Sequence, residues 1–180
     1  MGLEYSKELT EEQVNEFSKS SGFTKTQITK LYEKFMILNT QKNGRVSYQE
    51  FLNIPELASN PILERVISII DKNNNQFIEF SELIHTLSIF VVEEKKKERI
   101  DFVFKIYDLN GDGFISNGDL FLVLKSMAGD NLKDIQLQQI VDKTIAKFDK
   151  DEDGKLSYDE FINLTKDFKL DELLYYELEI

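Results

Sequence analysis

The chain contains no cysteine and no tryptophan, a single histidine, only two prolines and only eight glycines. The lack of cysteine excludes disulfide bonds and thiolate metal sites, and it is typical of intracellular proteins. The scarcity of helix-breaking residues in 180 positions predicts a mostly helical chain with short loops. Hydrophobic residues make up 41% of the sequence, which is enough to form a globular core.

Long apolar runs and an excess of basic charge are also missing. No run approaches the roughly 20 residues that cross a bilayer. The first residues, MGLEYSKELTEEQ, have no apolar core, so we expect no secretory signal. The formal net charge is -11, which makes nucleic acid a poor partner because phosphates require a basic face.

A catalytic centre is not indicated. His85 lies in FSELIHTLSIF, a segment predicted to be helical, where a surface or packed side chain is the simplest interpretation. The sequence offers no cysteine nucleophile and no zinc-binding HExxH motif. We therefore expect a protein that is not an enzyme.

Acidic residues instead recur in segments of one length, of which DKDEDGKLSYDE (residues 149–160, loop 4) is the most complete. Ca²⁺ takes about six to eight oxygen ligands, and a 12-residue loop supplies them from positions 1, 3, 5, 7, 9 and 12, with a turning glycine at position 6. The expected ligands are three carboxylates, a backbone carbonyl, a serine and a closing glutamate: Asp149, Asp151, Asp153, Lys155, Ser157 and Glu160. The segment predicts a calcium-binding EF-hand loop.

The segment DLNGDGFISNGD (residues 108–119, loop 3) follows the same pattern up to its last residue. Its expected ligands are Asp108, Asn110, Asp112, the carbonyl of Phe114, Ser116 and Asp119. Asp119 replaces the usual glutamate and has one methylene fewer, so it favours contact through a single oxygen. We expect a site that is weaker for Ca²⁺, or one that also binds Mg²⁺, which requires a compact octahedron.

Two further segments carry defects. In DKNNNQFIEFSE (residues 71–82, loop 2) the ligand oxygens are present, but Gln76 replaces the glycine and must take a strained positive φ. The expected ligands of loop 2 are Asp71, Asn73, Asn75, Phe77, Glu79 and Glu82. In NTQKNGRVSYQE (residues 39–50, loop 1) only the closing glutamate is charged, so a loop that packs without metal and a weak site are both compatible with the sequence. The ligand positions of loop 1 are Asn39, Gln41, Asn43, Arg45, Ser47 and Glu50.

The four loops form an internal repeat in which a helix precedes and follows each loop. Position 8 is apolar throughout, and we expect short antiparallel β-bridges that place Val46 opposite Ile78 and Ile115 opposite Leu156. The fold class is therefore all-α, with four EF-hands in two paired lobes. The expected organisation is an N-terminal arm (1–22), an N-lobe (23–91), a linker (92–99), a C-lobe (100–168) and a C-terminal tail (169–180).

Local signals place some helix boundaries. Thr24 is a plausible N-cap, and Asn60 followed by Pro61 predicts an N-cap and first residue for the next helix. The charged run EEKKKER is most simply a solvated linker or exposed helix.

The two ends of the chain carry additional signals. Gly2 after Met1, with Ser6, matches the N-myristoylation pattern, although an ordinary start of a chain would look the same. The tail is apolar beyond the need of a solvated end, so it either packs on its own lobe or contacts a groove or partner. Its apolar residues are Leu170, Leu173, Leu174, Tyr175 and Leu178.

The chain resembles the family of calcineurin regulatory B subunits. The stretch that carries the resemblance is YDLNGDGFISNGDLFLVLKSMAGDNLKDIQLQQIVDKTI (residues 107–145), and FLNIPELASNP agrees with it. This resemblance implies a heterodimer with calcineurin A, the catalytic subunit of a Ser/Thr phosphatase, whose amphipathic helix would lie in a hydrophobic groove. It also implies a myristoyl group on Gly2 and a cytoplasmic protein in contact with membranes.

Other functions stay open at this level. The segment GFTKTQITKLY is similar to the calcineurin B homologous proteins, which bind sodium/proton exchangers and have degenerate N-terminal hands. The intact ligand set of loop 2 and the short link between lobes favour the calcineurin B subunits. A free calcium sensor or buffer would need no partner groove.

Overall fold

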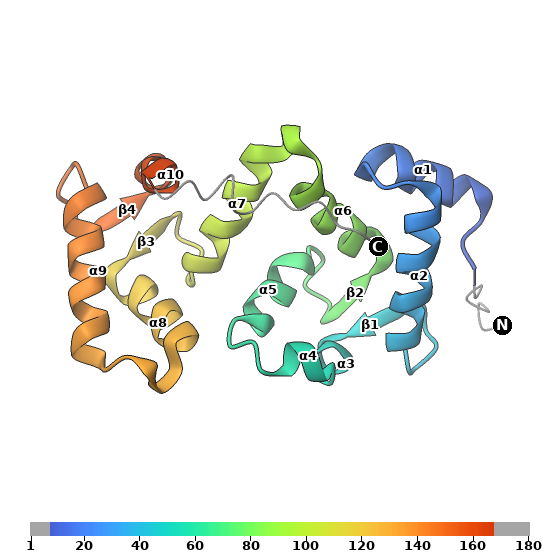
Figure 1. The fold of residues 1–180 in the computed structure, drawn as a ribbon, viewed down its shortest axis with the longest axis horizontal. Coiled ribbons are helices and arrows are strands. Elements are labelled where there is room, and N and C mark those ends of the chain that lie inside the picture. The colour runs from blue at the N-terminus through green and yellow to red at the C-terminus, as the bar shows by residue number, and fades with distance from the viewer. Residues whose placement is uncertain (1–7, 168–180) are drawn as a thin grey trace. The chain divides into compact units, whose positions relative to one another are not determined.

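The computed structural model describes residues 8–167, with the side chain of Glu56 excepted. The described residues divide into two compact units: unit 1 contains residues 8–59 and Leu63–Lys95, and unit 2 contains Asn60–Ile62 and residues 96–167. Each unit is mostly helical and holds a pair of short antiparallel strands (Figure 1). This confirms the predicted all-α class with β-bridges. The predictions for Gly2 and the tail lie outside the described residues.

Unit 1 holds loops 1 and 2. Its elements are α1 (Glu11–Ser21), α2 (Lys25–Leu38), β1 (Arg45–Ser47), α3 (Tyr48–Leu52), α4 (Pro55–Ala58), α5 (Leu63–Ile70), β2 (Phe77–Glu79), α6 (Phe80–Val91) and the 3-10 helix η1 (Glu93–Lys95). The predicted N-cap Thr24 accepts the N–H of Gln27 at the start of α2. Strands β1 and β2 place Val46 opposite Ile78, as predicted, and both side chains are fully buried.

The predicted start of α5 was wrong, because the helix begins at Leu63 rather than at Pro61. The side-chain oxygen of Asn60 accepts the N–H of Ile62 at 3.1 Å. This bond closes a turn over Pro61 and Ile62, so the asparagine caps a turn before the helix and not the helix itself.

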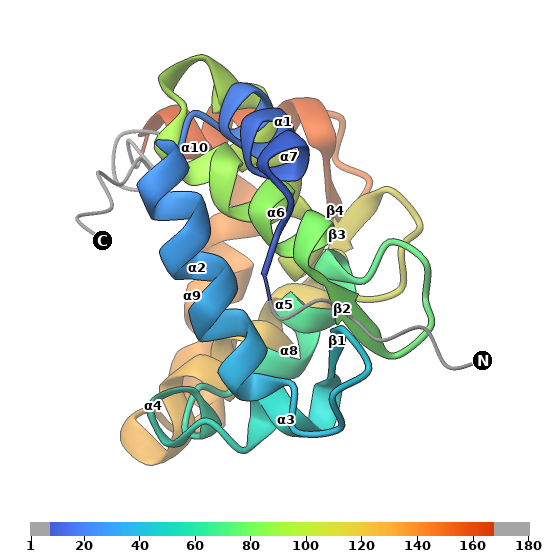
Figure 2. The ribbon, with the colours of Figure 1, turned by 90° about the vertical axis from the view of Figure 1, so that its right-hand side faces the viewer.

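Helix α1 was not predicted from the sequence. It begins after Thr10, which forms a capping box with Gln13, and it contacts α2 and α6 (Figure 2). The ring of Phe17 packs edge-to-face on Phe80, with centroids 5.4 Å apart. Gly22 ends the helix at φ 78°, and a Cβ there would lie 2.7 Å from Val92 Cγ2, so the close approach requires glycine.

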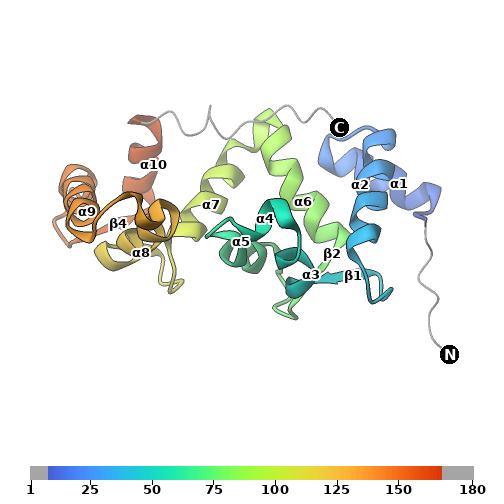
Figure 3. The same ribbon diagram turned by 60° about the horizontal axis from the view of Figure 1, so that its bottom comes forward.

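Unit 2 holds loops 3 and 4. Its elements are α7 (Lys96–Tyr107), β3 (Phe114–Ser116), α8 (Asn117–Ala128), the 3-10 helix η2 (Gly129–Asn131), α9 (Asp134–Phe148), β4 (Lys155–Ser157) and α10 (Tyr158–Asp167). Strands β3 and β4 place Ile115 opposite Leu156, as predicted, and helices α8 and α9 pack together (Figure 3). The buried core is apolar and consists of Ile100, Phe104, Ile115, Leu120, Val141, Ile145, Phe148, Leu156 and Phe161.

The charged run EEKKKER is helical, since it covers η1 and the first turn of α7. Most of its side chains lie on the surface, but Arg99 is only 3% exposed. The prediction of a solvated linker or exposed helix therefore holds for most of the run and fails at Arg99, which belongs to the packed side of α7.

Candidate metal centres

The four loops share one backbone turn, in which positions 4 and 6 take a positive φ. The residues at position 6 are Gly44, Gln76, Gly113 and Gly154, and those at position 4 are Lys42, Asn74, Gly111 and Glu152. Gln76 adopts φ 64°, the left-handed conformation predicted for it, at a cost of about 1 kcal/mol for a residue with a Cβ. Sequence reasoning missed position 4, because no single residue type marks it.

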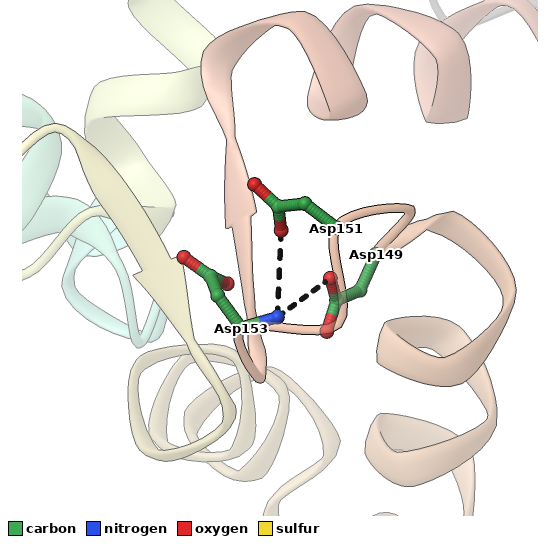
Figure 4. A group of neighbouring side chains, drawn as sticks. All are labelled: Asp149, Asp151 and Asp153. Atoms are coloured by element: carbon green, nitrogen blue, oxygen red, sulfur yellow. Dashed lines mark hydrogen bonds between the residues drawn. The ribbon is translucent and has the colours of Figure 1, made fainter.

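Loop 4 brings its three aspartates together. Single carboxylate oxygens of Asp149, Asp151 and Asp153 lie within 4.8 Å of one another, a spacing that a metal ion could span (Figure 4). The N–H of Asp153 donates to Asp149 (3.2 Å) and to Asp151 (3.4 Å), and the N–H of Gly154 donates to Asp149 (2.8 Å). Desolvation, and then the charge of Asp153, raise the pKa of Asp151. A cation among the three groups would relieve that repulsion.

The closing residue of loop 4 links both ends of the loop. Glu160 is 7% exposed; one of its oxygens accepts the N–H of Lys150 (2.7 Å), and the other accepts the N–H and hydroxyl of Ser157 (2.8 and 2.7 Å). These hydrogen bonds, that of Lys150 first, lower the pKa of Glu160 and keep it ionised. The carboxylate is thus positioned and charged for a cation.

Loop 3 has the same beginning and a different end. The carboxylate of Asp108 accepts the N–H groups of Gly111 (2.8 Å) and Gly113 (3.0 Å), as expected for position 1. Asp119 accepts hydrogen bonds from the N–H (3.0 Å) and hydroxyl (2.6 Å) of Ser116 through one oxygen. Among the described residues it makes no hydrogen bond to position 2, which the glutamates of the other loops do reach. The shorter side chain therefore closes the loop less completely.

Loop 2 keeps the common arrangement despite Gln76. Asp71 is 2% exposed and accepts the N–H groups of Asn75 (3.2 Å) and Gln76 (2.8 Å). Glu82 accepts the N–H of Lys72 (3.2 Å) through one oxygen and the N–H of Glu79 (2.9 Å) through the other. The replacement of glycine has thus left the geometry of the ligand positions in place.

Loop 1 satisfies its only charged ligand position with hydrogen bonds. One oxygen of Glu50 accepts the N–H (2.7 Å) and the hydroxyl (2.5 Å) of Thr40, and the other accepts the N–H (2.8 Å) and hydroxyl (2.9 Å) of Ser47. Burial alone would raise the pKa of Glu50, but these donors, led by the Thr40 hydroxyl, lower it to about 2. Sequence reasoning missed Thr40, because position 2 is not a ligand position.

The remaining predicted ligands lie where the β-bridges begin. Phe77, Phe114 and Lys155 are the first residues of β2, β3 and β4. Their N–H groups donate to the position-5 side chains Asn75, Asp112 and Asp153 at 2.8, 2.9 and 2.9 Å. In loop 1, Arg45 and Asn43 form the equivalent bond at 3.1 Å. The structure therefore orients the position-5 oxygens of every loop in the same way.

Unit 2 also contains an apolar cavity of about 200 Å³. Most of its lining is hydrophobic and comes from α7 to α10 and the β-bridge: Tyr107, Ile115, Leu120, Leu124, Ile140, Thr144, Leu156, Phe161 and Leu164. Ile140 on α9 remains 44% exposed at this cavity. The cavity could accept an apolar side chain from another molecule.

Comparisons with known proteins agree with this geometry. A family model for an EF-hand domain pair matches residues 97–166. The chain is 52% identical to the calcineurin B subunit of Naegleria gruberi, over 85% of this chain and 86% of the relative. The chain belongs to the family of calcineurin B subunits. The type 1 calcineurin B subunit of Dictyostelium discoideum is 49% identical over 87% of each chain, and the type 2 calcineurin B subunit of Mus musculus is 45% identical over 82% of this chain and 83% of the relative.

This membership confirms the resemblance inferred from residues 107–145. Ca²⁺ is the cofactor that an EF-hand protein of the calcineurin B family implies, and the oxygen-only ligand positions of loops 2, 3 and 4 suit that hard cation. Among residues 8–167, no helix has the length and apolar character needed to span a membrane.

Proposed function

We propose that this chain is a calcium-binding, non-catalytic regulatory subunit of the Ser/Thr protein phosphatase calcineurin and forms a heterodimer with the catalytic subunit, calcineurin A. The observation that carries the proposal is the identity to calcineurin B subunits along about 85% of the chain. The matching region is too long to fall within one unit, so it includes parts of both.

The cavity in unit 2 supports a helical partner. An amphipathic helix binds through apolar anchors at i, i+3, i+4 and i+7, which enter hydrophobic depressions between helices. The cavity is lined almost entirely by aliphatic and aromatic residues, and Ile140 lies exposed at it. We therefore assign it as one anchor pocket for the amphipathic helix of the catalytic subunit.

Loops 2, 3 and 4 are the proposed calcium sites, and loop 1 is a loop that folds without metal. Loop 4 has four carboxylates at ligand positions, and desolvation, followed by the charges of Asp153 and Glu160, raises the pKa of Asp151. Loop 1 has one carboxylate, and Thr40 and Ser47 already donate to both of its oxygens. A divalent ion would gain little charge stabilisation there and would have to displace these donors.

Loop 3 is the proposed site for both Ca²⁺ and Mg²⁺. Asp119 has one methylene fewer than Glu160 and, among the described residues, does not reach the N–H of position 2 as that glutamate does. The shorter reach fits six-fold coordination better than the seven-fold coordination that a bidentate glutamate supports. We further propose that Gly2 is N-myristoylated and that the protein is cytoplasmic with a reversible membrane contact, since a single acyl chain gives only marginal binding.

The test is capture of the tagged full-length chain from its native extract, with Ca²⁺ or with chelator, followed by mass spectrometry. We expect a phosphatase catalytic chain in near-equal amount under both conditions. Ile140→Glu should abolish its capture, whereas Ile135→Glu, at a 69% exposed position of α9 outside the cavity lining, should retain it. Recovery of an ion exchanger would assign the chain to the homologous proteins, and the absence of any stoichiometric partner would favour a buffer.

A further inference from the structure

Tyr48 belongs to the repeat of loop 1 but contacts loop 2 at two points. It is the first residue of α3, directly after β1. Its hydroxyl donates to Oδ2 of Asp71 at 3.0 Å, across 23 positions of sequence. Its backbone N–H donates to the carbonyl of Gln76 at 3.3 Å. Tyr48 comes from the repeat of loop 1, which has no aspartate ligand. It thus bonds both Asp71, the first ligand of loop 2, and Gln76, which replaces the glycine in the turn of loop 2.

The Tyr48 hydroxyl donates to the Asp71 carboxylate together with two backbone N–H groups of loop 2. Oδ2 of Asp71 accepts both the Tyr48 hydroxyl and the N–H of Gln76, whereas Oδ1 accepts the N–H of Asn75. Because a carboxylate has about four lone-pair sites, Oδ1 retains acceptor capacity for a cation. Asp149, the equivalent residue of loop 4, receives backbone N–H groups of Asp153 and Gly154.

The backbone N–H of Tyr48 bonds the turn at Gln76, the position where loop 2 lacks the usual glycine. Gln76 has φ 64° and carries a Cβ, so its conformation is intrinsically less favourable than that of Gly154 at the same position. Its N–H is bonded to Asp71 and its carbonyl to Tyr48, so the peptide units on both sides of Gln76 are held. Tyr48, Gln76 and Asp71 form a closed set of three hydrogen bonds.

We propose that Tyr48 is a positioning residue for the cation site of loop 2, through which the metal-free loop 1 sets the calcium affinity of loop 2. The inference rests on the proposed assignment of loop 2 as a calcium site. Groups that hold a metal ligand in place reduce the ordering that binding would otherwise require, and their loss typically weakens metal binding by about 10- to 100-fold.

The other unit provides a matched control. Tyr158 occupies the same position in the repeat of loop 4 and is also the first residue of its helix, α10. Its hydroxyl donates to Asp101 on α7, which is not part of any loop. Tyr158→Phe therefore removes an equivalent tyrosine–aspartate hydrogen bond without touching a proposed calcium ligand.

The experiment is a Ca²⁺ titration of the full-length chain followed by NMR, with the amides of Gln76 and Gly154 reporting on loops 2 and 4. Tyr48→Phe is expected to raise the Kd of loop 2 by about tenfold and to leave loop 4 unchanged. Tyr158→Phe is expected to change neither Kd. Because phenylalanine retains the ring, the dispersion of the amide spectrum checks that unit 1 stays folded.

A second background tests whether the effect of the Tyr48 hydroxyl depends on the strained turn at Gln76. In a Gln76→Gly background the turn needs less support, so the same Tyr48→Phe change should weaken loop 2 by a smaller factor. An unchanged loop 2 Kd in Tyr48→Phe, or an equal loss in Tyr158→Phe, would overturn the positioning role while the calcium site itself stands. If the wild-type Gln76 amide does not respond to Ca²⁺, the assignment of loop 2 fails as well.

Discussion

Loops 1 and 4 have nearly the same shape but differ in what satisfies their charge. In both, a buried glutamate accepts the N–H of position 2 at 2.7 Å and of position 9 at 2.8 Å. In both, position 8 pairs in a β-bridge with the neighbouring loop. Loop 4, however, gathers three aspartates, whereas loop 1 has neutral side chains at those positions and a threonine hydroxyl on its glutamate.

The difference shows that a loop of this shape can fold with only one carboxylate at its ligand positions. The capping hydrogen bonds and the β-bridge preserve the shape, and they require only the glutamate, a small hydroxyl residue and an apolar position 8. Cation binding requires excess negative charge, which loop 4 supplies with three aspartates and a glutamate at its ligand positions. Loop 1 has the glutamate, the hydroxyl residue and the apolar position 8, but it lacks carboxylates at positions 1, 3 and 5.

The largest expected effect is on loop 4. Glu160→Gln removes the closing carboxylate and should weaken Ca²⁺ binding there by about 100-fold, because the bidentate contact at position 12 is lost. Calorimetric titration of the full-length chain would measure it. Glu50→Gln is the matched change in loop 1 and should leave the Ca²⁺ affinity of loop 4 unaltered. The loss of one bound Ca²⁺ equivalent in Glu50→Gln would mean that loop 1 is also a metal site.

The second effect is on stability and its pH dependence. Glu50→Gln should lower the free energy of unfolding near neutral pH by about 2 kcal/mol, because the N–H and hydroxyl groups of Thr40 and Ser47 lose an anionic acceptor in the buried Glu50. The folded-state pKa of Glu50 is about 2, below its ordinary value of 4.5, so its contribution is complete above about pH 5 and is lost as the pH falls toward 2.

Denaturant unfolding in calcium-free buffer at several pH values would test this expectation. The difference between wild type and Glu50→Gln should shrink steadily below about pH 5. Glu33→Gln, at an exposed position of α2, serves as the control and should change stability by less than about 0.5 kcal/mol at every pH. A difference that does not depend on pH would contradict the charged role of Glu50.

Loop 3 has more carboxylates at its ligand positions than loop 1, but it ends in a shorter residue than loop 4. Lengthening its last residue should bring its Ca²⁺ affinity closer to that of loop 4. Asp119→Glu should increase Ca²⁺ affinity by about tenfold and reduce competition by Mg²⁺, because the longer side chain can offer both oxygens. Competition titrations with the two ions would measure the change. Glu82→Asp is the reverse change in loop 2 and should weaken Ca²⁺ there. Equal affinities before and after Asp119→Glu would show that the reach of position 12 is not what limits loop 3.

The smallest expected effect concerns the turn of loop 2. Gln76→Gly should stabilise the metal-free protein by about 1 kcal/mol, since glycine takes the observed φ of 64° without strain. Thermal unfolding in chelator would detect it. Gln41→Gly, at a position of loop 1 without a positive φ, should instead destabilise through chain entropy. A loss of stability in Gln76→Gly would indicate that the glutamine side chain has a role of its own.

The sequence was sufficient to predict the four loops, their β-bridges, the N-cap at Thr24 and the family. These features depend on residues close together in the chain, such as the spacing of oxygens around Gly154 or the apolar residue at position 8, and local geometry dictates them. The strain at Gln76 could be predicted for the same reason. A helix boundary preceded by a separate turn was predicted less accurately, since α5 begins at Leu63 and not at Pro61.

Which groups meet across the repeats depends on tertiary packing and could not be predicted from the sequence. The packing of Phe17 on Phe80 and the contact of Tyr48 with Asp71 join residues that lie far apart in the chain, and the burial of Arg99 is not marked by the charged run around it. The hydroxyl of Thr40 reaches Glu50 only because the loop closes on itself. Such contacts depend on where folding brings the side chains, and neither periodicity nor spacing along the chain encodes that.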